Sequence, residues 1–184
     1  IRDYCHAHEM RAVALRYFNA AGADHKGRFG ERHDPETHLI PLVLETAMGK
    51  RDLFTILGGD YPTPDGTCIR DFIHVTDIAD AHLKALTLLP ESPGHDAFNL
   101  GNKEGISVRE IITTIERITG RPVPVRVAPR RPGDPPALVG DPTRAENSLG
   151  WKPRHSDLET IITTAWSWMR QLSEKNLPDS TTPI

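Results

Sequence analysis

The segment Gly59–Leu86, GDYPTPDGTCIRDFIHVTDIADAHLKAL, decides which fold the chain is expected to adopt. A loop rich in Pro, Gly, Asp and Thr runs into the apolar stretch IRDFIHV, and a helical pattern follows it. Thr76 is predicted to cap that helix, because acidic residues follow in what would be its first turn. The helix residues expected to face inward are Ile78, His82, Leu83 and Leu86.

The end of the quoted loop raises a question of function. Arg70 closes the loop, Asp71 stands directly beside it, and apolar residues follow. Either the two charges form an ordinary surface ion pair, or the loop holds a ligand that Arg70 grips.

Strand and helix patterns alternate along the chain. Apolar or alternating runs predict strands at 12–15, 53–57, 96–102 and 123–128. The first of these runs is typical of a buried parallel strand. Helical patterns cover 39–49, 107–120, 141–150 and 156–172. Capping boxes are predicted at Ser107–Glu110 and Ser156–Glu159, and the alternation as a whole predicts an α/β fold.

Composition limits the possible functions. The 184 residues are 38% hydrophobic and 26% charged, enough for one domain with a core or for two small lobes. A net charge of -3 argues against a nucleic-acid binder, and no apolar run is as long as a membrane span. Two cysteines, Cys5 and Cys68, make no disulfide framework and indicate a reducing, cytoplasmic compartment. Because the chain opens at Ile1 in a helical pattern without Met, we expect a piece of a longer protein, ending in a flexible tail at 174–184.

Several self-sufficient sites are excluded by motif. The sequence contains no G-x-G-x-x-G, no P-loop and no G-x-S-x-G. Cys5, His6 and His8 are too crowded for a helical metal pair, which needs i and i+4 spacing. His33 and His38 lie five positions apart in a predicted loop, where solvated histidines are the better interpretation. We therefore expect no metal site.

Three loops remain as candidates for a ligand site. Asn19 follows the first predicted strand, where α/β proteins collect ligands, although a turn-forming Asn explains it equally well. The stretch RRPGD at 130–134 holds two arginines and Asp134, which either are simply solvated or suit phosphate and sugar hydroxyls. Together with Arg70 they favour a sugar nucleotide, with arginines at the diphosphate and Asp134 at the ribose.

In combination, these pieces resemble the UDP-glucose 4-epimerases of the extended short-chain dehydrogenase/reductase family. The quoted loop is the most specific piece, since related nucleotide-sugar enzymes keep R-D-x-x-H-V-x-D but seldom the whole of YPTPDGTCIRDFIHVTDIADAH. The resemblance covers most of residues 12–170, in order and at the family spacing. Its other pieces are LRYFNAAGA (15–23), HLIPLVLETAMGKRDLFTIL (38–57), FNLGN (98–102), SVREII (107–112), PRRPGDPPALVGDPTRAENSLGWKP (129–153) and the W-x-W pair Trp166 and Trp168.

The resemblance implies a fold, a cofactor and a reaction. It implies the carboxyl-terminal half of an NAD-dependent enzyme that interconverts UDP-glucose and UDP-galactose by transient hydride transfer from sugar C4 to NAD. It further implies two parts: elements of an incomplete Rossmann fold at 1–19 and about 70–102, and a substrate-binding lobe at about 20–69 and 103–173. The full-length protein is expected to be a homodimer.

The family's catalytic Tyr-x-x-x-K motif is absent from this sequence. Tyr4, Tyr17 and Tyr61 have no Lys four residues on. We therefore expect no catalytic residue in this chain, which by itself would be inactive.

The resemblance also implies residue roles at the nucleotide. Arg70 and Arg131 match the diphosphate-binding arginines, and Asp134 matches the residue that accepts from the ribose. The segment that cradles uracil, largely through its backbone, corresponds to Thr55, Ile56 and Leu57.

At the cofactor and the sugar, Tyr17 and Phe18 would lie beside the nicotinamide of NAD, and Asn19 would contact the substrate. His38 and Leu39 match a substrate-contacting pair that is usually Asn-Leu. Phe72 stands where Tyr is common, so any contact that needs the hydroxyl is lost. Leu138 stands where Tyr often lines the sugar pocket, and the smaller side chain implies tolerance of N-acetylated sugars.

Rival interpretations stay open at this point. One is another enzyme of the extended family, such as a 4,6-dehydratase or a uronate 4-epimerase. Another is a catalytically inactive lobe that only binds UDP-sugars. A purely structural module is least favoured, because the loops carry the residues of a ligand site.

Overall fold

The computed structural model describes residues 1–88 and 93–174, and it confirms the predicted α/β class. No helix in those ranges is both long and apolar enough to cross a membrane. The expected flexible tail lies, apart from its first residue, outside the described residues. The elements are α1 (Arg2–Ala7), β1 (Arg11–Arg16), β2 (Asn19–Ala21), α2 (Leu39–Ala47), β3 (Phe54–Leu57), β4 (Ile69–Arg70), β5 (Phe72–His74), α3 (Val75–Thr87), β6 (Gly94–Asn99), β7 (Ile106–Ser107), α4 (Val108–Thr119), β8 (Val125–Ala128), β9 (Ala137–Leu138), α5 (Thr143–Leu149) and α6 (Leu158–Glu174).

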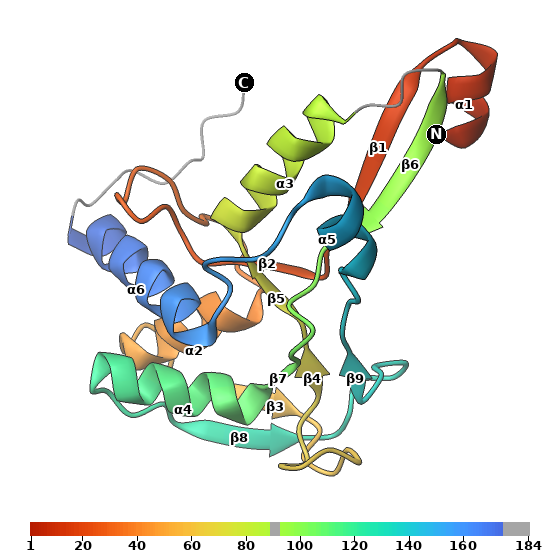
Figure 1. The fold of residues 1–184 in the computed structure, drawn as a ribbon. Coiled ribbons are helices and arrows are strands. Elements are labelled where there is room, and N and C mark those ends of the chain that lie inside the picture. Colours follow the sequence, from red (N-terminus) through yellow and green to blue (C-terminus); the bar gives the residue numbers. More distant parts are fainter. Residues whose placement is uncertain (89–92, 175–184) are drawn as a thin grey trace.

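The strands pair across long sequence separations into several small sheets (Figure 1). β1 pairs with β6, β2 with β5 and β3 with β8, each in parallel. β4 lies between β7, which is antiparallel to it, and β9, which is parallel. Since parallel pairing needs a crossover connection, these ladders place distant loops side by side.

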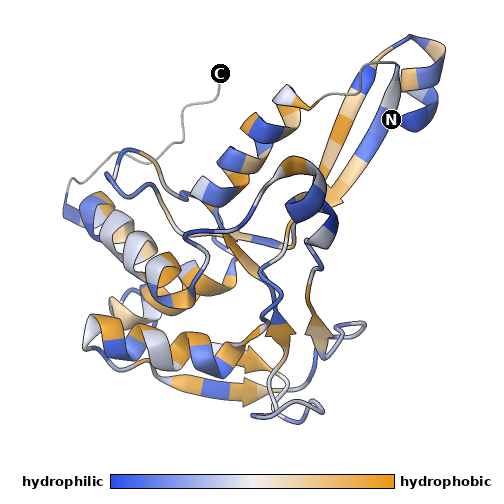
Figure 2. Cartoon of the chain, in the orientation of Figure 1, coloured by the Kyte–Doolittle hydropathy of each residue, from blue (hydrophilic) through white to orange (hydrophobic). Residues whose placement is uncertain are grey.

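The larger hydrophobic core lies between α2, α4 and α6. The predicted capping box of α4 is confirmed: the Ser107 hydroxyl accepts from the Glu110 N–H, and the Glu110 carboxylate accepts from the Ser107 N–H. Gly120, at φ 66°, ends the helix in the left-handed conformation. Hydrophobic and hydrophilic residues alternate along α4 (Figure 2), and its Ile111 and Ile115 are fully buried.

A second hydrophobic core joins α3, α5 and β6 around Trp151, which is fully buried. Beyond it, α1, β1 and β6 project away from the helical body (Figure 1). β1 is half-exposed along its middle rather than buried as predicted. The reason is its sparse cover: in the described part of the chain, β6 is the one strand beside it and α3 the helix against it.

The predicted start of α3 is wrong, and its predicted inward face is only partly right, because Ile78 is buried whereas His82, Leu83 and Leu86 are exposed. The cap is His74, whose ring nitrogen Nδ1 accepts from the Thr76 N–H at 3.1 Å, and the helix begins at Val75. Leu83 and Leu86 point outward, with 65% and 64% of their surfaces exposed. The buried side of the helix is set by residues at spacings of three and four: Asp77, Ile78, Ala81 and Ala85.

The predicted capping box at Ser156–Glu159 is also wrong. Asp157 performs the capping, since its carboxylate accepts from the Thr160 N–H at 2.8 Å. Ser156 is used elsewhere, because its hydroxyl donates to the buried carboxylate of Asp77 at 2.6 Å.

The carboxylate of Asp77 anchors the loop that follows Trp151. One of its oxygens, Oδ2, accepts from the N–H groups of Arg154 and His155 and from the hydroxyl of Ser156. Its backbone carbonyl accepts from the Trp151 indole at 2.9 Å. Asp77, in the first turn of α3, therefore fixes the segment 151–156 that leads into α6.

Replacing Asp77 should destabilise the protein far more than replacing a neighbouring acid. Asp77→Ala leaves buried donors without an acceptor, which we expect to lower the free energy of unfolding by about 2–4 kcal/mol. Urea unfolding of the complete protein that carries this sequence measures the change. Asp80→Ala, on the same helix, is the control and should cost less than about 1 kcal/mol. Equal losses in the two variants would contradict the anchoring role of Asp77.

Candidate ligand-binding site

A cavity of about 950 Å³ lies between the loop that follows β2, the helices α2 and α6, and the first turn of α3. Six of the residues predicted from the sequence line it: Tyr17, Phe18, Asn19, His38, Leu39 and Phe72. These residues come from the end of β1, from β2, from the start of α2 and from β5. The fold thus brings these six residues together, whereas Leu138, for which a sugar contact was also predicted, does not line the cavity.

Strand pairing positions two of these side chains. Asn19 and Phe72 are register partners in the parallel pair β2 and β5. The Asn19 amide nitrogen donates to the Asp71 carbonyl at 2.7 Å, so a ligand in the cavity would meet its amide oxygen. Phe72 is buried and packs in the larger core, so it forms a fixed wall of the cavity.

Asp71 is a buried structural residue and does not form a surface pair with Arg70. Its carboxylate accepts from the Asn102 N–H at 3.1 Å and from the Gly140 N–H at 2.9 Å. Burial raises the pKa of Asp71 above its ordinary value. The residue between Arg70 and Phe72 therefore ties the loops after β6 and β9 to the centre of the fold.

Arg70 forms an ion pair with Asp134, the residue predicted to accept from a ribose. Both side chains are mostly buried, at 14% and 21% exposure, and Arg70 also donates to the Ile69 carbonyl at 2.7 Å. Leu138 is the register partner of Arg70 across β4 and β9, which places the two side chains on one face. The sequence did not predict that two ligand-binding candidates contact each other.

The Arg131 backbone lies beside Asp134, since the Arg131 carbonyl accepts from the Asp134 N–H at 3.2 Å. Burial raises the pKa of the Cys68 thiol, and the charges of Arg70, Asp134 and Arg131 all act on it. The Arg131 side chain itself is exposed. Two cations and one carboxylate from distant loops are thus gathered beside the sheet that contains β4.

The turn before Arg70 is centred on the carboxylate of Asp65. The Asp65 carboxylate accepts from the Thr67 N–H at 2.8 Å and from the Ser107 hydroxyl at 2.5 Å. Gly66 adopts φ 79°, and a Cβ there would stand 2.4 Å from the Gly59 carbonyl oxygen. A short aspartate-centred turn therefore fixes the direction in which the chain enters β4.

The strand β3 offers backbone groups at one of its edges. The N–H groups of Phe54 and Gly58 donate to carbonyls on the β8 side, at 2.8 Å each. Because successive strand residues direct their backbone groups to opposite edges, Thr55 and Leu57 direct theirs away from β8. In residues 1–88 and 93–174, no further strand occupies that edge. Ile56 is buried beneath it.

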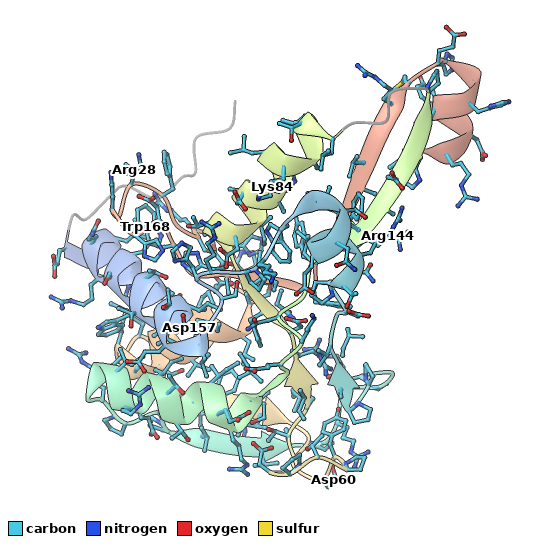
Figure 3. All side chains as sticks on the ribbon, in the orientation of Figure 1. Arg28, Asp60, Lys84, Arg144, Asp157 and Trp168 are labelled. Carbon is cyan, nitrogen blue, oxygen red and sulfur yellow. The ribbon has the colours of Figure 1, made fainter. Side chains whose placement is uncertain are left out.

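The loop that follows β2 closes over α6, a contact that the sequence did not predict. The Trp168 indole donates to the Glu31 carbonyl at 2.8 Å, and Trp168 lies below the part of the loop that carries Arg28 (Figure 3). Gly30 sits against the indole so closely that a Cβ would be 2.3 Å from it. Glu31 and Trp168 line the cavity, and the sequence singled out only Trp168, as part of the W-x-W pair, without a role at the site.

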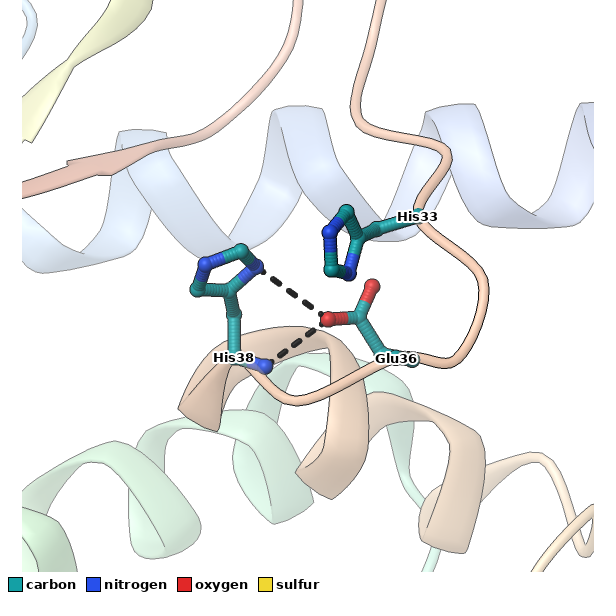
Figure 4. Close-up of side chains that lie close together, drawn as sticks. All are labelled: His33, Glu36 and His38. Carbon is teal, nitrogen blue, oxygen red and sulfur yellow. Dashed lines mark hydrogen bonds and ion pairs between the residues drawn. The ribbon is translucent and has the colours of Figure 1, made fainter.

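Three residues of this loop gather at the cavity rim: His33, Glu36 and His38 (Figure 4). The ring centroids of the two histidines are 5.2 Å apart, and both residues are exposed, as expected of solvated histidines. His38 Nδ1 lies 2.5 Å from a carboxylate oxygen of Glu31 and 3.2 Å from one of Glu36. Burial, and then the charge of Glu36, raise the pKa of Glu31.

His74 is the last residue of β5 and caps α3, so it lies next to elements that line the cavity. It is fully buried, and its Nε2 lies 3.1 Å from the Thr164 hydroxyl on α6. Burial lowers the pKa of His74 to about 4, and the nearby rings of His25 and His155 act in the same direction. The charges of Asp77 and Asp157 oppose that shift. His74 is therefore neutral at neutral pH.

Comparison with known proteins identifies the family. The model of the NAD dependent epimerase/dehydratase family matches residues 1–101. A UDP-glucose 4-epimerase of Halalkalibacterium halodurans is 49% identical over 90% of this chain and 49% of its own length. Among solved structures, the Brucella ovis UDP-glucose 4-epimerase in complex with NAD is 56% identical with a TM-score of 0.85, over 90% of this chain and 51% of that one. The Bifidobacterium longum enzyme, with NAD+ and UDP, is 35% identical with a TM-score of 0.85, over 92% and 50% of the two chains.

The chain therefore belongs to the NAD dependent epimerase/dehydratase family. It spans about half the length of the curated relatives and solved structures that it matches. The relatives at this level of identity are UDP-glucose 4-epimerases, in agreement with the resemblance seen in the sequence.

Acidification should destabilise the protein through His74. Because its pKa is lowered to about 4 on folding, the unfolded state binds the extra proton first as the pH falls below about 6.5. We expect the free energy of unfolding to fall by up to about 3 kcal/mol between pH 6.5 and pH 4 from this residue. Urea unfolding as a function of pH measures the slope.

The variant His74→Asn separates this effect from other titrations. Asn can still cap α3 but does not titrate, so the slope between pH 6.5 and pH 4 should become shallower. His6→Ala, at an exposed histidine of α1, should leave the slope unchanged. An unchanged slope in His74→Asn would contradict the assignment.

Proposed function

We propose that the complete protein carrying this sequence interconverts UDP-glucose and UDP-galactose, and that this chain supplies residues that bind the UDP-sugar. The observation that carries the proposal is the gathering of Arg70, Arg131 and Asp134 beside one small sheet. Two residues along the chain from Arg70, Phe72 forms a wall of the large cavity. The relatives named UDP-glucose 4-epimerase support the same conclusion.

The diphosphate and the ribose occupy the arginine cluster in this proposal. Arg70 and Arg131 pair with phosphate oxygens, for which the planar guanidinium is well suited. Asp134 accepts from a ribose hydroxyl through Oδ2, the carboxylate oxygen that does not pair with Arg70. Because the ion pair is already formed before binding, the guanidinium of Arg70 is held in place and loses little freedom when the diphosphate arrives.

The uracil base lies against the edge of β3. Thr55 and Leu57 direct backbone N–H and C=O groups to that edge, and such groups can pair with the edge of a pyrimidine. Leu57 is partly exposed there and offers an apolar contact to the ring. Recognition through the backbone explains why these positions need no particular polar side chain.

The sugar and the nicotinamide share the large cavity. Tyr17 and Phe18 are 42% and 43% exposed at its wall, which fits a planar ring such as the nicotinamide of NAD. When bound, NAD supplies the acceptor and donor of the C4 hydride. The amide oxygen of Asn19 and the residues His38 and Leu39 contact the hexose. At about 950 Å³ the cavity is large for one hexose, so the ring can turn over while the nucleotide stays bound.

The proposal includes the setting of the complete protein: a cytoplasmic homodimer in which this chain contributes two lobes. The free thiols of Cys5 and Cys68 support a reducing compartment. The two hydrophobic cores support a division into a Rossmann part and a substrate-binding part, although α5 packs with the former. The homodimer rests on the family resemblance alone.

Removal of Arg131 should weaken the binding of the nucleotide. A hydrogen bond to a charged group is worth about 1.5–3 kcal/mol, so Arg131→Ala should raise the Kd for UDP-glucose about tenfold or more. Isothermal titration of the complete protein measures the affinity. Arg117→Ala on α4 is the control, since that guanidinium pairs with Glu159 on α6 and should leave the affinity unchanged. An unaltered Kd in Arg131→Ala would refute the role.

Leu138 should permit turnover of N-acetylated substrates. Its side chain shares a face with Arg70 and is smaller than Tyr, which leaves room for an acetamido group. We expect the complete enzyme to turn over UDP-N-acetylglucosamine as well as UDP-glucose, and Leu138→Tyr to lower the first activity selectively. Chromatographic assays of the two substrates test this. Absence of acetylated turnover in the enzyme with Leu138 would show that the pocket is closed by other groups.

A further inference from the structure

The loop at the cavity rim carries a set of metal-ligating side chains that neither the UDP-sugar nor the NAD proposal requires as a set. His33, Glu36 and His38 each offer one ligand atom, and these atoms all lie within 4.8 Å of one another (Figure 4). The cluster lies at the start of α2, and α6 passes behind it in Figure 4.

One of the separations between ligand atoms matches that of a tetrahedral metal site, and the others are no longer than 4.8 Å. With metal–ligand bonds of about 2.0–2.1 Å, two ligand atoms of one tetrahedral ion are about 3.3 Å apart. The separation of His38 Nδ1 from the Glu36 oxygen is 3.2 Å. Rotation of the His33 ring, which is exposed, can shorten the remaining separations without movement of the backbone.

The carboxylate of Glu36 is held in position before any ion binds. Its Oε1 accepts from the N–H groups of Thr37 and His38, at 2.7 and 2.8 Å, and its side chain is only 9% exposed. Such hydrogen bonds orient a ligand and are a general feature of protein metal sites. The histidines are exposed at the rim, so an ion can reach them from solvent.

Glu31 offers a fourth ligand. Its carboxylate oxygen lies 2.5 Å from His38 Nδ1, and the Trp168 indole holds its carbonyl in place. Two imidazoles with carboxylates form a ligand set that suits zinc and similar ions rather than Mg²⁺.

We propose that His33, Glu36 and His38 bind one divalent first-row transition-metal ion, with Glu31 or water as the fourth ligand. The ion joins the middle of the loop to the N-terminus of α2 and thereby holds the rim of the cavity together. This site is distinct in chemistry from the arginine cluster.

The test uses the complete, untagged protein, freed of metal with EDTA and dialysed into chelator-free buffer. Titration with ZnCl₂ should give one bound ion per chain with a Kd in the micromolar range or below, and MgCl₂ should give none. CoCl₂ should produce the visible absorption bands of four-coordinate Co²⁺. Zinc should also raise the Tm of the wild-type protein.

The informative variants are His33→Ala and Glu36→Gln, because neither residue has a role in the proposed UDP-sugar binding. Each should weaken zinc binding at least tenfold and abolish the Tm shift, whereas His6→Ala, at an exposed histidine elsewhere, should behave as wild type. His33→Gln, which keeps the side-chain size, replaces His33→Ala if the latter lowers the Tm without metal.

Two results would overturn the proposal. One is the absence of stoichiometric zinc binding by the wild-type protein. The other is equal zinc affinity in wild type, His33→Ala and Glu36→Gln, which would place the metal elsewhere. The readout is metal binding itself, so a failure here leaves the UDP-sugar proposal standing, and a failure of UDP-glucose binding leaves this one standing.

Discussion

The buried carboxylate of Asp71 is the interaction on which the candidate site depends. It accepts backbone N–H groups from the loops after β6 and β9, while its own carbonyl accepts from Asn19. A buried carboxylate is costly unless it is hydrogen-bonded, so these loops are held in one arrangement. Its two neighbours in the chain, Arg70 and Phe72, are thereby directed to the arginine cluster and to the cavity wall.

This arrangement divides the site into a firmly held part and a roomy part. Arg70, Asp134 and the edge of β3 are fixed by ion pairing and strand pairing, whereas the cavity that contains Tyr17 and Asn19 is wide. The proposed reaction, which presents both faces of a sugar to one cofactor, needs this combination, because binding energy from the distant nucleotide retains an intermediate that turns freely. The division between the two parts of the site arises from tertiary packing, because each part is built from loops that lie far apart in the sequence.

Local signals in the sequence succeeded where the capping hydroxyl stayed available as an acceptor: the Ser107 hydroxyl donates to the distant Asp65 but still accepts from the Glu110 N–H. The box at Ser107–Glu110 forms as predicted, because its partners are three residues apart on one helix. The box at Ser156–Glu159 does not form, because the buried Asp77 takes the Ser156 hydroxyl across a separation of 79 residues. For the same reason, the apolar pattern did not place Leu83 and Leu86: their exposure depends on which elements pack against α3.

By itself, the sequence determined the class of fold and the family, and it predicted the residues that would bind a sugar nucleotide. These follow from local patterns and from a loop specific enough to carry a resemblance. Only the tertiary structure decided which of these residues contact one another: that Arg70 pairs with Asp134, and that His33 meets Glu36 and His38. Such contacts depend on how loops close over distant elements, as the loop after β2 closes over Trp168, and loop conformation is set by packing rather than by local propensity.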